Sequence, residues 1–210
     1  MSAKELLESL FDADRKLREA ESALLAHPEA EELARTLERA ADQAFALEDA
    51  PEAAARLLRL SDLCAQVQGP RTADTLLRIL NHQAPEVRVA AGEALRDFAY
   101  DRYAEVARAI ERALDKALPG PALQEVPWIL AEIGEPSAVP LIARCLKHPD
   151  VEVVASGIEA LAEIGDEAAL ALLQPLTKDK RVVQLEDGDA AYSTTIGELA
   201  TEAISELEDR

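Results

Sequence analysis

The sequence predicts an all-α fold: a right-handed solenoid of stacked helix pairs, with an N-terminal helical cap and a small β-hairpin insertion near the C-terminus. Composition is the first indication, because Ala, Leu and Glu dominate the 210 residues, aromatic residues make up 3%, and only 8 glycines occur. Such a composition suits many short amphipathic helices packed side by side. The other two indications are an internal repeat and apolar residues spaced by three and four.

The repeat is clearest between two segments of the second half of the chain. LNHQAPEVRVAAGEALRDF (80–98) aligns without gaps on LKHPDVEVVASGIEALAEI (146–164), at an offset of 66 residues or two units of about 33. Between them lies VPWILAEIG, whose Gly134 matches Gly165, the residue that follows the later segment, at an offset of 31. Each unit is interpreted as two helices whose apolar stripes are buried only when units stack.

The repeat predicts four helix pairs. They are expected over 71–82 with 86–99, 102–117 with 122–134, 137–147 with 151–164, and 167–177 with 196–208. Proline is expected near helix starts or in breaks, where a missing amide costs little, at Pro85, Pro127, Pro136 and Pro149, and within a first turn at Pro140.

The first 70 residues repeat poorly but have helical apolar periodicity, with breaks near Pro28, Pro51 and Gly69-Pro70. We expect three capping helices over 1–70, followed by repeats over 71–210, in one continuous structural unit. The spacing of Leu10, Leu17 and Leu24 also permits a coiled-coil dimer contact, although three leucines are few for one.

A short insertion separates the last two helices. RVVQLEDGDAAYSTT has the apolar alternation and the Asp187-Gly188 turn signal of a β-hairpin at about 182–195. Because a lone hairpin is marginally stable, it must pack on the solenoid or be ordered by a partner.

Two segments resemble a known family. PEVRVAAGEALRDF and VEVVASGIEALAEIGD are similar to the second helix of bacterial HEAT repeats, of the kind also found in phycobiliprotein-lyase-like proteins. The resemblance covers roughly residues 71–210 and implies a HEAT-like α-solenoid. It does not specify the function, because the family includes scaffolds, adaptors, inhibitors and a few lyases.

The net charge of −19 disfavours direct binding to nucleic acid or anionic membrane and favours a partner with a basic surface. The acidic residues could also serve only to solvate the outer faces. Cys64 and Cys145 are expected to be small core residues. With no leader-like N-terminus and no long apolar run, a soluble cytoplasmic protein of unknown oligomeric state is expected.

No combination of residues predicts catalysis, a metal site or a cofactor. Phosphate-binding glycine loops, paired histidines one turn apart and a serine elbow are absent from the sequence. His82 and His148 occupy the same position in two repeats, at the end of a first helix. There a partly cationic ring would meet the negative end of the helix dipole, and His27 is interpreted in the same way.

The candidate partner-binding residues come from stacking the second helices, which are expected to line the concave side. One column holds Glu93, Trp128, Glu159 and Glu202, and the next holds Asp97, Glu132, Glu163 and Glu206. The result is a ladder of acids interrupted by the only tryptophan. Trp128 is expected to be an exposed interface anchor, unless Pro127 displaces the helix and turns the ring inward.

The sequence therefore favours a non-catalytic scaffold or adaptor that binds a basic protein segment on an acidic concave face. One alternative is an inhibitor or immunity protein against a nuclease-like toxin. Another, which rests on family resemblance alone, is a bilin chromophore lyase. A DNA-lesion enzyme of the HEAT-like kind would need a cationic groove, which this acidic chain does not predict.

Overall fold

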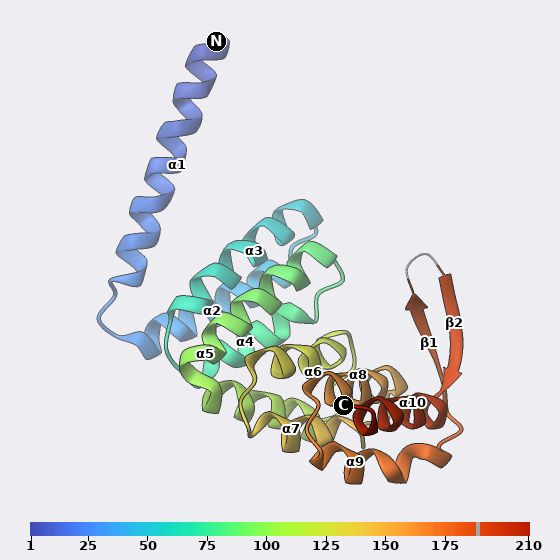
Figure 1. The fold of residues 1–210 in the computed structure, drawn as a ribbon. Coiled ribbons are helices and arrows are strands. Elements are labelled where there is room, and N and C mark those ends of the chain that lie inside the picture. The colour runs from blue at the N-terminus through green and yellow to red at the C-terminus, as the bar shows by residue number, and fades with distance from the viewer. Residues whose placement is uncertain (188–189) are drawn as a thin grey trace.

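The computed structural model describes residues 1–187 and 190–210 and is dominated by helices (Figure 1). In chain order the elements are α1 (Ala3–Leu25), α2 (Ala30–Phe45), α3 (Ala50–Gln66), α4 (Pro70–Leu80), α5 (Pro85–Asp115), α6 (Ala122–Ile133), α7 (Ala138–Cys145), α8 (Val151–Ile164), α9 (Ala168–Leu173), the 3-10 helix η1 (Gln174–Lys178), β1 (Val182–Asp187), β2 (Ala190–Thr195) and α10 (Ile196–Glu208).

The four predicted helix pairs are present. The predicted break before residue 102 lies inside α5, where Arg102 has φ −141° and ψ 41° and divides the helix into a first segment (85–101) and a second segment (103–115). The pairs are therefore α4 with the first segment of α5, its second segment with α6, α7 with α8, and α9–η1 with α10. Gly134 and Gly165, which the repeat aligns, both end a helix with φ near 70°.

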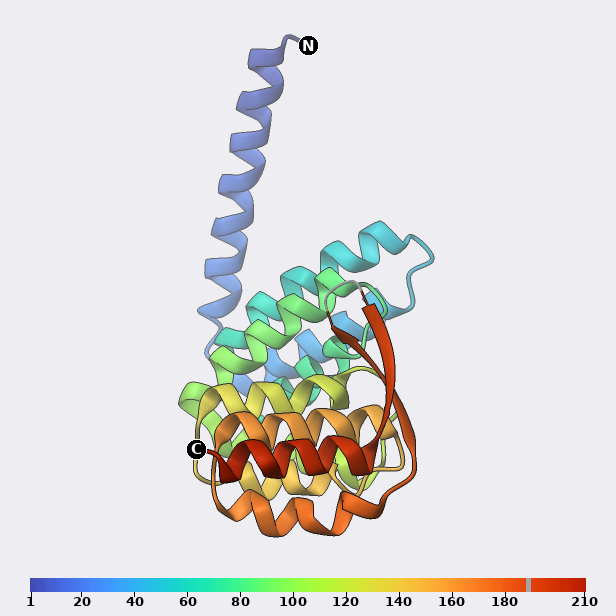
Figure 2. The same cartoon turned by 45° about the vertical axis from the view of Figure 1, so that its right-hand side comes forward.

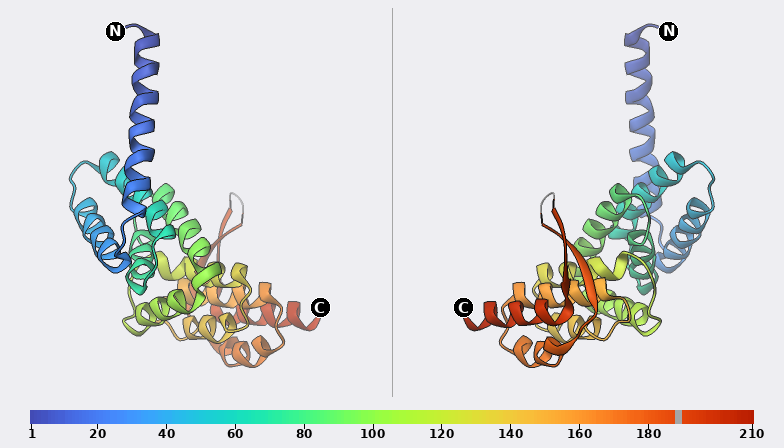
Figure 3. Two further views of the ribbon diagram at one scale, coloured as in Figure 1. Left: turned by 90° about the vertical axis from the view of Figure 1, so that its left-hand side faces the viewer. Right: turned by 90° about the vertical axis from the view of Figure 1, so that its right-hand side faces the viewer.

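The helices form two curved layers (Figures 2 and 3). We call the second helices of the pairs the inner layer; they are α3, the first segment of α5, α6, α8 and α10, each packed against the next. The outer layer consists of α2, α4, the second segment of α5, α7 and α9. The apolar core runs without interruption between the layers, from Leu33 to Ala203.

The three helices expected over residues 1–70 are present as α1, α2 and α3. α2 and α3 pack on each other and continue the two layers, because α2 contacts α4 and α3 contacts α5. They form a first helix pair, and packing continues across residue 70; the domain division there remains a prediction. α1 contains no buried residue and projects away from the array, as all views show, so it does not cover the end of the stack (Figure 1).

The hairpin lies where the sequence predicts it. β1 and β2 are antiparallel, with Val182 opposite Thr195 and Asp187 opposite Ala190, while Gly188 of the predicted turn lies outside the described residues. β1 packs on α8, and the Val183 side chain is buried. In each view the strands extend from α10 toward the level of the N-terminal helices (Figure 3).

The start of α10 fixes the hairpin to the array. The Thr195 side chain accepts a hydrogen bond from the backbone amide of Glu198, and the Glu198 carboxylate accepts one from the amide of Thr195. Gly197 packs so closely on η1 that an added Cβ would lie 2.8 Å from the carbonyl oxygen of Thr177. The backbone of α10 therefore packs directly against the backbone of η1 at Gly197.

Candidate protein-interaction surface

Trp128 is exposed on the inner layer. Its helix, α6, runs through Pro127, which is inside the helix and buried, so the expectation that this proline lies near a helix start or in a break is wrong. Trp128 retains 41% exposure. The alternative in which Pro127 turns the ring inward as a filler is therefore not what the structure shows.

Two neighbouring grooves of the inner layer meet at Trp128 and Glu132. The first, of about 350 Å³, lies between α5 and α6 and is also lined by Glu93 and by Val89, which is 61% exposed. The second, of about 870 Å³, lies at the C-terminal ends of α6 and α8, where the α6–α7 connection and the start of α7 also line it, and it includes Glu163. The structure thus brings four of the predicted residues together, because three carboxylates line the two grooves that meet at the exposed Trp128 ring.

The other four predicted residues do not line these two grooves. Glu202 lines a separate hollow at the start of α10, beside Lys178 and Lys180. Asp97 and Glu206 are exposed on their helices. Glu159 is only partly exposed, and burial raises the pKa of its carboxyl group.

Arg96 is a residue of this surface that the predicted columns miss. Its guanidinium donates a hydrogen bond to the Glu132 carboxylate, which raises the pKa of Arg96, with smaller contributions from Glu93 and Asp97. The predicted ladder of acids is therefore interrupted by a cation as well as by Trp128. Sequence spacing contained the signal, because Arg96 lies three residues after Glu93 on the same helix.

Tyr100 is a second residue that the columns miss. It lies seven residues after Glu93, which places it on the same side of α5, and it is 61% exposed. Apart from Glu132, the predicted carboxylates form no ion pair with any described residue; these are Glu93, Asp97, Glu159, Glu163, Glu202 and Glu206.

In the outer layer, by contrast, acids are paired. Arginines of one outer helix form ion pairs with acids of the preceding outer helix. Arg71 of α4 contacts Glu31 and Glu38 of α2, each at 3.0 Å. Arg112 of α5 contacts Asp74 of α4 at 2.7 Å. Arg144 of α7 continues the series with Glu111 and Asp115 of α5. This arginine ladder neutralises acids along the outer layer, whereas six of the seven predicted inner-layer carboxylates form no ion pair with the described residues.

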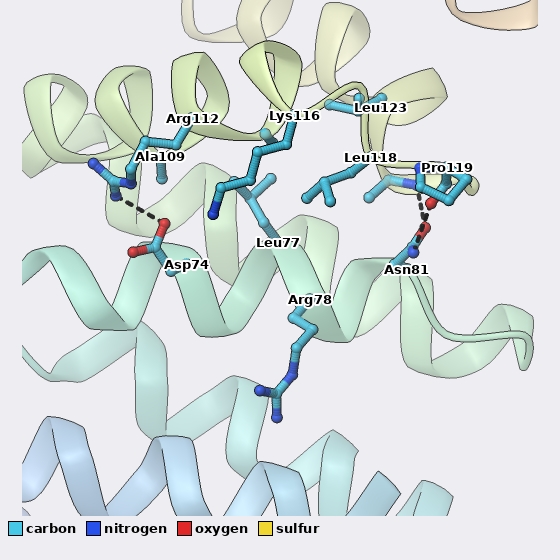
Figure 4. A pocket seen from close by; sticks show the side chains of 12 residues that line it. Asp74, Leu77, Arg78, Asn81, Ala109, Arg112, Lys116, Leu118, Pro119 and Leu123 are labelled. Carbon is cyan, nitrogen blue, oxygen red and sulfur yellow. Dashed lines mark hydrogen bonds and ion pairs between the residues drawn. The ribbon is translucent and has the colours of Figure 1, made fainter. Parts of the chain in front are cut away.

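An outer groove of about 540 Å³ lies between α4 and the second segment of α5 (Figure 4). Its floor is apolar, with Leu77, Ala109, Ala113, Leu118 and Leu123, and its rim carries Arg78, Arg112 and Lys116. Asn81 closes one end by donating to the carbonyl oxygen of Pro119 (3.0 Å) and accepting from the amide of Ala122 (3.2 Å).

The histidines have local structural roles. Nδ1 of His82 accepts a hydrogen bond from the amide of Ala84 (3.0 Å), and Nδ1 of His148 accepts one from the amide of Asp150 (3.1 Å). His27 receives the equivalent bond from Glu29. In all three cases the bond joins the ring to the backbone just beyond a helix end, and the interaction of the ring with the helix dipole stays a prediction.

Both cysteines lie in the apolar core. Burial raises the pKa of Cys64 and Cys145 to about 12, so both thiols are inert core residues. Within residues 1–187 and 190–210, no cluster of three or more His, Cys, Asp or Glu side chains is placed to hold a metal ion. None of the helices in these ranges combines the length and apolar character needed to cross a membrane.

Comparison with known proteins places the fold in a class. Residues 123–186, from α6 into β1, match the family model for HEAT repeats, which supports the HEAT-repeat family indicated by the sequence. HEAT repeats are generally protein-interaction scaffolds and are typically non-catalytic. The fold is thus that of a helical-repeat solenoid, and its residues 123–186 are similar to HEAT repeats.

Two further comparisons add no particular identity. No curated protein matches the chain. Among solved structures, an engineered protein determined by a structural genomics consortium is 18% identical, and the alignment covers 91% of this chain and 96% of that one. Its TM-score of 0.36 is too low for an argument.

Proposed function

We propose that the protein is a non-catalytic scaffold or adaptor that binds a basic segment of another protein along its inner layer, with Trp128 at the centre of the contact. The observation that carries this proposal is the meeting of two grooves at Trp128 and Glu132. Exposed apolar side chains surrounded by polar ones are typical of interface centres, and tryptophan is enriched among the residues that dominate binding energy.

The distribution of charge supports a basic partner. Because the arginine ladder neutralises acids along the outer layer, the unpaired carboxylates of the inner layer are free to attract cations. An Arg or Lys of the partner would stack on the Trp128 ring and approach Glu93 or Glu163 in the adjoining grooves. Such an association weakens as salt is added.

The burial of Glu159 also supports a partner with a basic surface. Its carboxylate is partly buried without a cationic partner among the described residues, and the raised pKa reports the cost of keeping it charged. A cation brought by the partner would offset that cost. Binding of a basic partner would therefore stabilise the charged form of the Glu159 carboxylate.

Neither alternative has an observation of its own in its favour. An inhibitor of a nuclease-like toxin would use the same acidic face, and nothing in the two grooves distinguishes it from an adaptor. No residue of either groove favours the bilin lyase that the narrower family resemblance suggests. The scaffold or adaptor is therefore kept as the proposed function, and a cytoplasmic location is part of the same proposal.

The proposal predicts that Trp128→Ala combined with Glu163→Lys weakens partner binding by about thirtyfold or more, since it removes an anchor of the hot-spot type and reverses an attractive charge. The partner is first captured from cells of the protein's source at low salt. Its affinity for the wild type and for the variant is then measured by titration calorimetry at low and high salt.

The matched control is Phe45→Ala with Glu32→Lys, which makes the same kinds of change on α2 of the outer layer. Phe45 is 38% exposed, close to the exposure of Trp128. The control is expected to bind like the wild type. Equal affinities for all three proteins, or a loss confined to the control, would remove the inner layer as the binding surface.

A further inference from the structure

The N-terminal helix α1 has an apolar face that stands free of the array, and we propose that it pairs, antiparallel, with α1 of a second copy of the chain. Two identical helices would thereby form the contact of a symmetric dimer. The contact lies away from the inner layer, and it does not depend on the function proposed above.

The free part of α1 is Ala3–Ala20, which is about 27 Å of helix. Every residue of this part is exposed, and a capping box stabilises its first turn. At the base of the helix, Glu21 pairs with Arg59 of α3 at 2.9 Å, and Leu24 and Leu25 pack on the core. Both views of Figure 3 show α1 leaving the array from there. The free part therefore has room for a second helix along its whole length.

The apolar residues of the free part follow a heptad pattern. They recur at alternating spacings of three and four, at Ala3, Leu6, Leu10, Ala13, Leu17 and Ala20. This spacing places them in one stripe, which we call the seam, and it is the spacing at which two helices pack along each other. Leu6 and Leu10 are 52% and 62% exposed. An exposed seam on a free, capped helix predicts that a second helix covers it.

The two flanks of the seam suit another α1. On one flank, Leu7 and Phe11 widen the apolar face in the first half of the helix, where they are 50% and 59% exposed. The other flank carries the polar residues Glu5, Ser9 and Lys16. In antiparallel pairing each flank meets the same flank of the second copy, whereas in parallel pairing it meets the opposite one. Antiparallel pairing is thus the arrangement that joins the two apolar flanks.

A two-fold axis between Phe11 and Asp12 brings the free seams of both copies together. Leu10 then packs beside Ala13 of the second copy, so that a large side chain meets a small one. On the apolar flank, Phe11 of each copy meets Phe11 of the other, with Leu7 next to this pair. Because the contact is isologous, every one of these interactions occurs twice. The exposed apolar side chains of the first half of α1 are covered in this arrangement.

The charges of α1 agree with antiparallel pairing. Residues 4–14 carry four acids and one lysine, whereas residues 15–18 carry three cations. An antiparallel pair sets the acidic stretch of one helix beside the basic stretch of the other. In the proposed register, Lys16 lies on the flank that carries Glu5 of the second copy.

Ion pairs within α1 leave Lys16 for this contact. Arg15 and Arg18 pair with Asp12 and Asp14 of their own helix, whereas Lys16 forms no ion pair with any described residue. A register closer to the base of α1 would set Lys16 against Lys16 and Asp14 against Asp14, which is unfavourable. The charges therefore favour a contact centred on the free part of the helix.

Sedimentation equilibrium of the full-length chain tests the second copy. The mass is expected to rise with concentration from the monomer value of 22.7 kDa toward that of a dimer. Leu10→Glu is expected to weaken self-association by at least about tenfold, because it places a charge in the apolar contact. Since Leu10 is exposed in the single chain, the variant should keep the circular dichroism spectrum and thermal midpoint of the wild type at concentrations where both are monomers.

The matched control is Val89→Glu, which places the same charge at a 61% exposed apolar residue of the inner layer. It is expected to leave self-association unchanged. The comparison separates a contact through α1 from an association through the surface around Trp128.

Disulfide cross-linking tests the orientation. Leu6→Cys and Leu17→Cys are made as separate variants, one of them with a size tag, and are mixed under mild oxidation. The two native cysteines are buried and their pKa values are raised to about 12, so they do not compete. Because Leu6 lies beside Leu17 of the second copy in the proposed register, the mixed disulfide is expected to form faster than either disulfide between like positions.

Three outcomes overturn the proposal: a monomer at all concentrations, a dimer unaffected by Leu10→Glu, or disulfides that join like positions faster than unlike ones. The first would leave the seam to a different protein, and the second would place the dimer contact on another surface. The third would mean that the two helices pair in parallel.

Discussion

At the scale of single residues, the electrostatic role of a carboxylate depends on its burial and its neighbours as well as on its column in the repeat. Glu159 and Glu163 are both acids of the inner layer, one turn apart on α8, but Glu163 is exposed, whereas Glu159 is partly buried and burial raises its pKa. Glu132, in the same column as Glu163, is paired with Arg96. The predicted columns therefore contain carboxylates with different electrostatic roles.

Glu159 gives a prediction for stability. A carboxyl whose folded pKa lies above its unfolded pKa costs nothing below the unfolded value and costs most above the folded value. Glu159→Gln is thus expected to raise the free energy of unfolding at pH 7, by on the order of 1 kcal/mol, and to lose this advantage as the pH falls toward the carboxyl range. Urea unfolding of both proteins at pH 7 and pH 4 measures the difference.

The control for this prediction is Glu163→Gln, because Glu163 is exposed on the same helix. It should leave the unfolding free energy nearly unchanged at both pH values. A destabilised Glu159→Gln at pH 7 would contradict the account, since it would mean that the carboxylate has a favourable partner.

At the scale of elements, much of the fold could be predicted from the sequence. The helix pairs, the break near residue 102 and the hairpin follow from apolar periodicity and from turn residues, which act locally. The location of α1 could not be predicted in the same way. Its leucines indicate an apolar face, but periodicity does not say whether that face meets the array, a second copy or solvent.

Close packing between elements gives a further prediction, at two glycines. An alanine Cβ at Gly197 would meet two backbone carbonyl oxygens of the η1 region at 2.8 and 2.9 Å, whereas at Gly92 its nearest neighbour is the Cδ1 of Leu80 at 3.6 Å. Gly197→Ala is expected to destabilise the protein by about 1–3 kcal/mol through overpacking. Gly92→Ala is expected to stabilise it by about 0.5–1 kcal/mol, because α5 loses a flexible helical residue.

Thermal and urea unfolding of the two variants measure whether Gly197→Ala lowers the stability of the protein and Gly92→Ala raises it. If Gly197→Ala were neutral, α10 would not dock on η1 through its backbone as described. A destabilised Gly92→Ala would instead mean that the space beside Leu80 and Ile129 is filled in solution.

At the scale of the whole molecule, the two layers divide the charge. Arginines link the outer helices in series, while the inner layer keeps most of its carboxylates unpaired around Trp128. The repeat alignment predicted which acids share a column, because helical position repeats with the unit. It could not predict which of them pair, since Arg96 reaches Glu132 on the next helix and such contacts depend on packing between repeats.

The central claim is that the inner layer around Trp128 is the surface that binds the partner. The chain has a single tryptophan, so its fluorescence reports on this surface alone. Quenching by neutral acrylamide should be efficient in the free protein, as expected for a ring that is 41% exposed, and should fall when the captured partner is added to saturation. A ring protected in the free protein, or quenched equally with and without the bound partner, would contradict the claim.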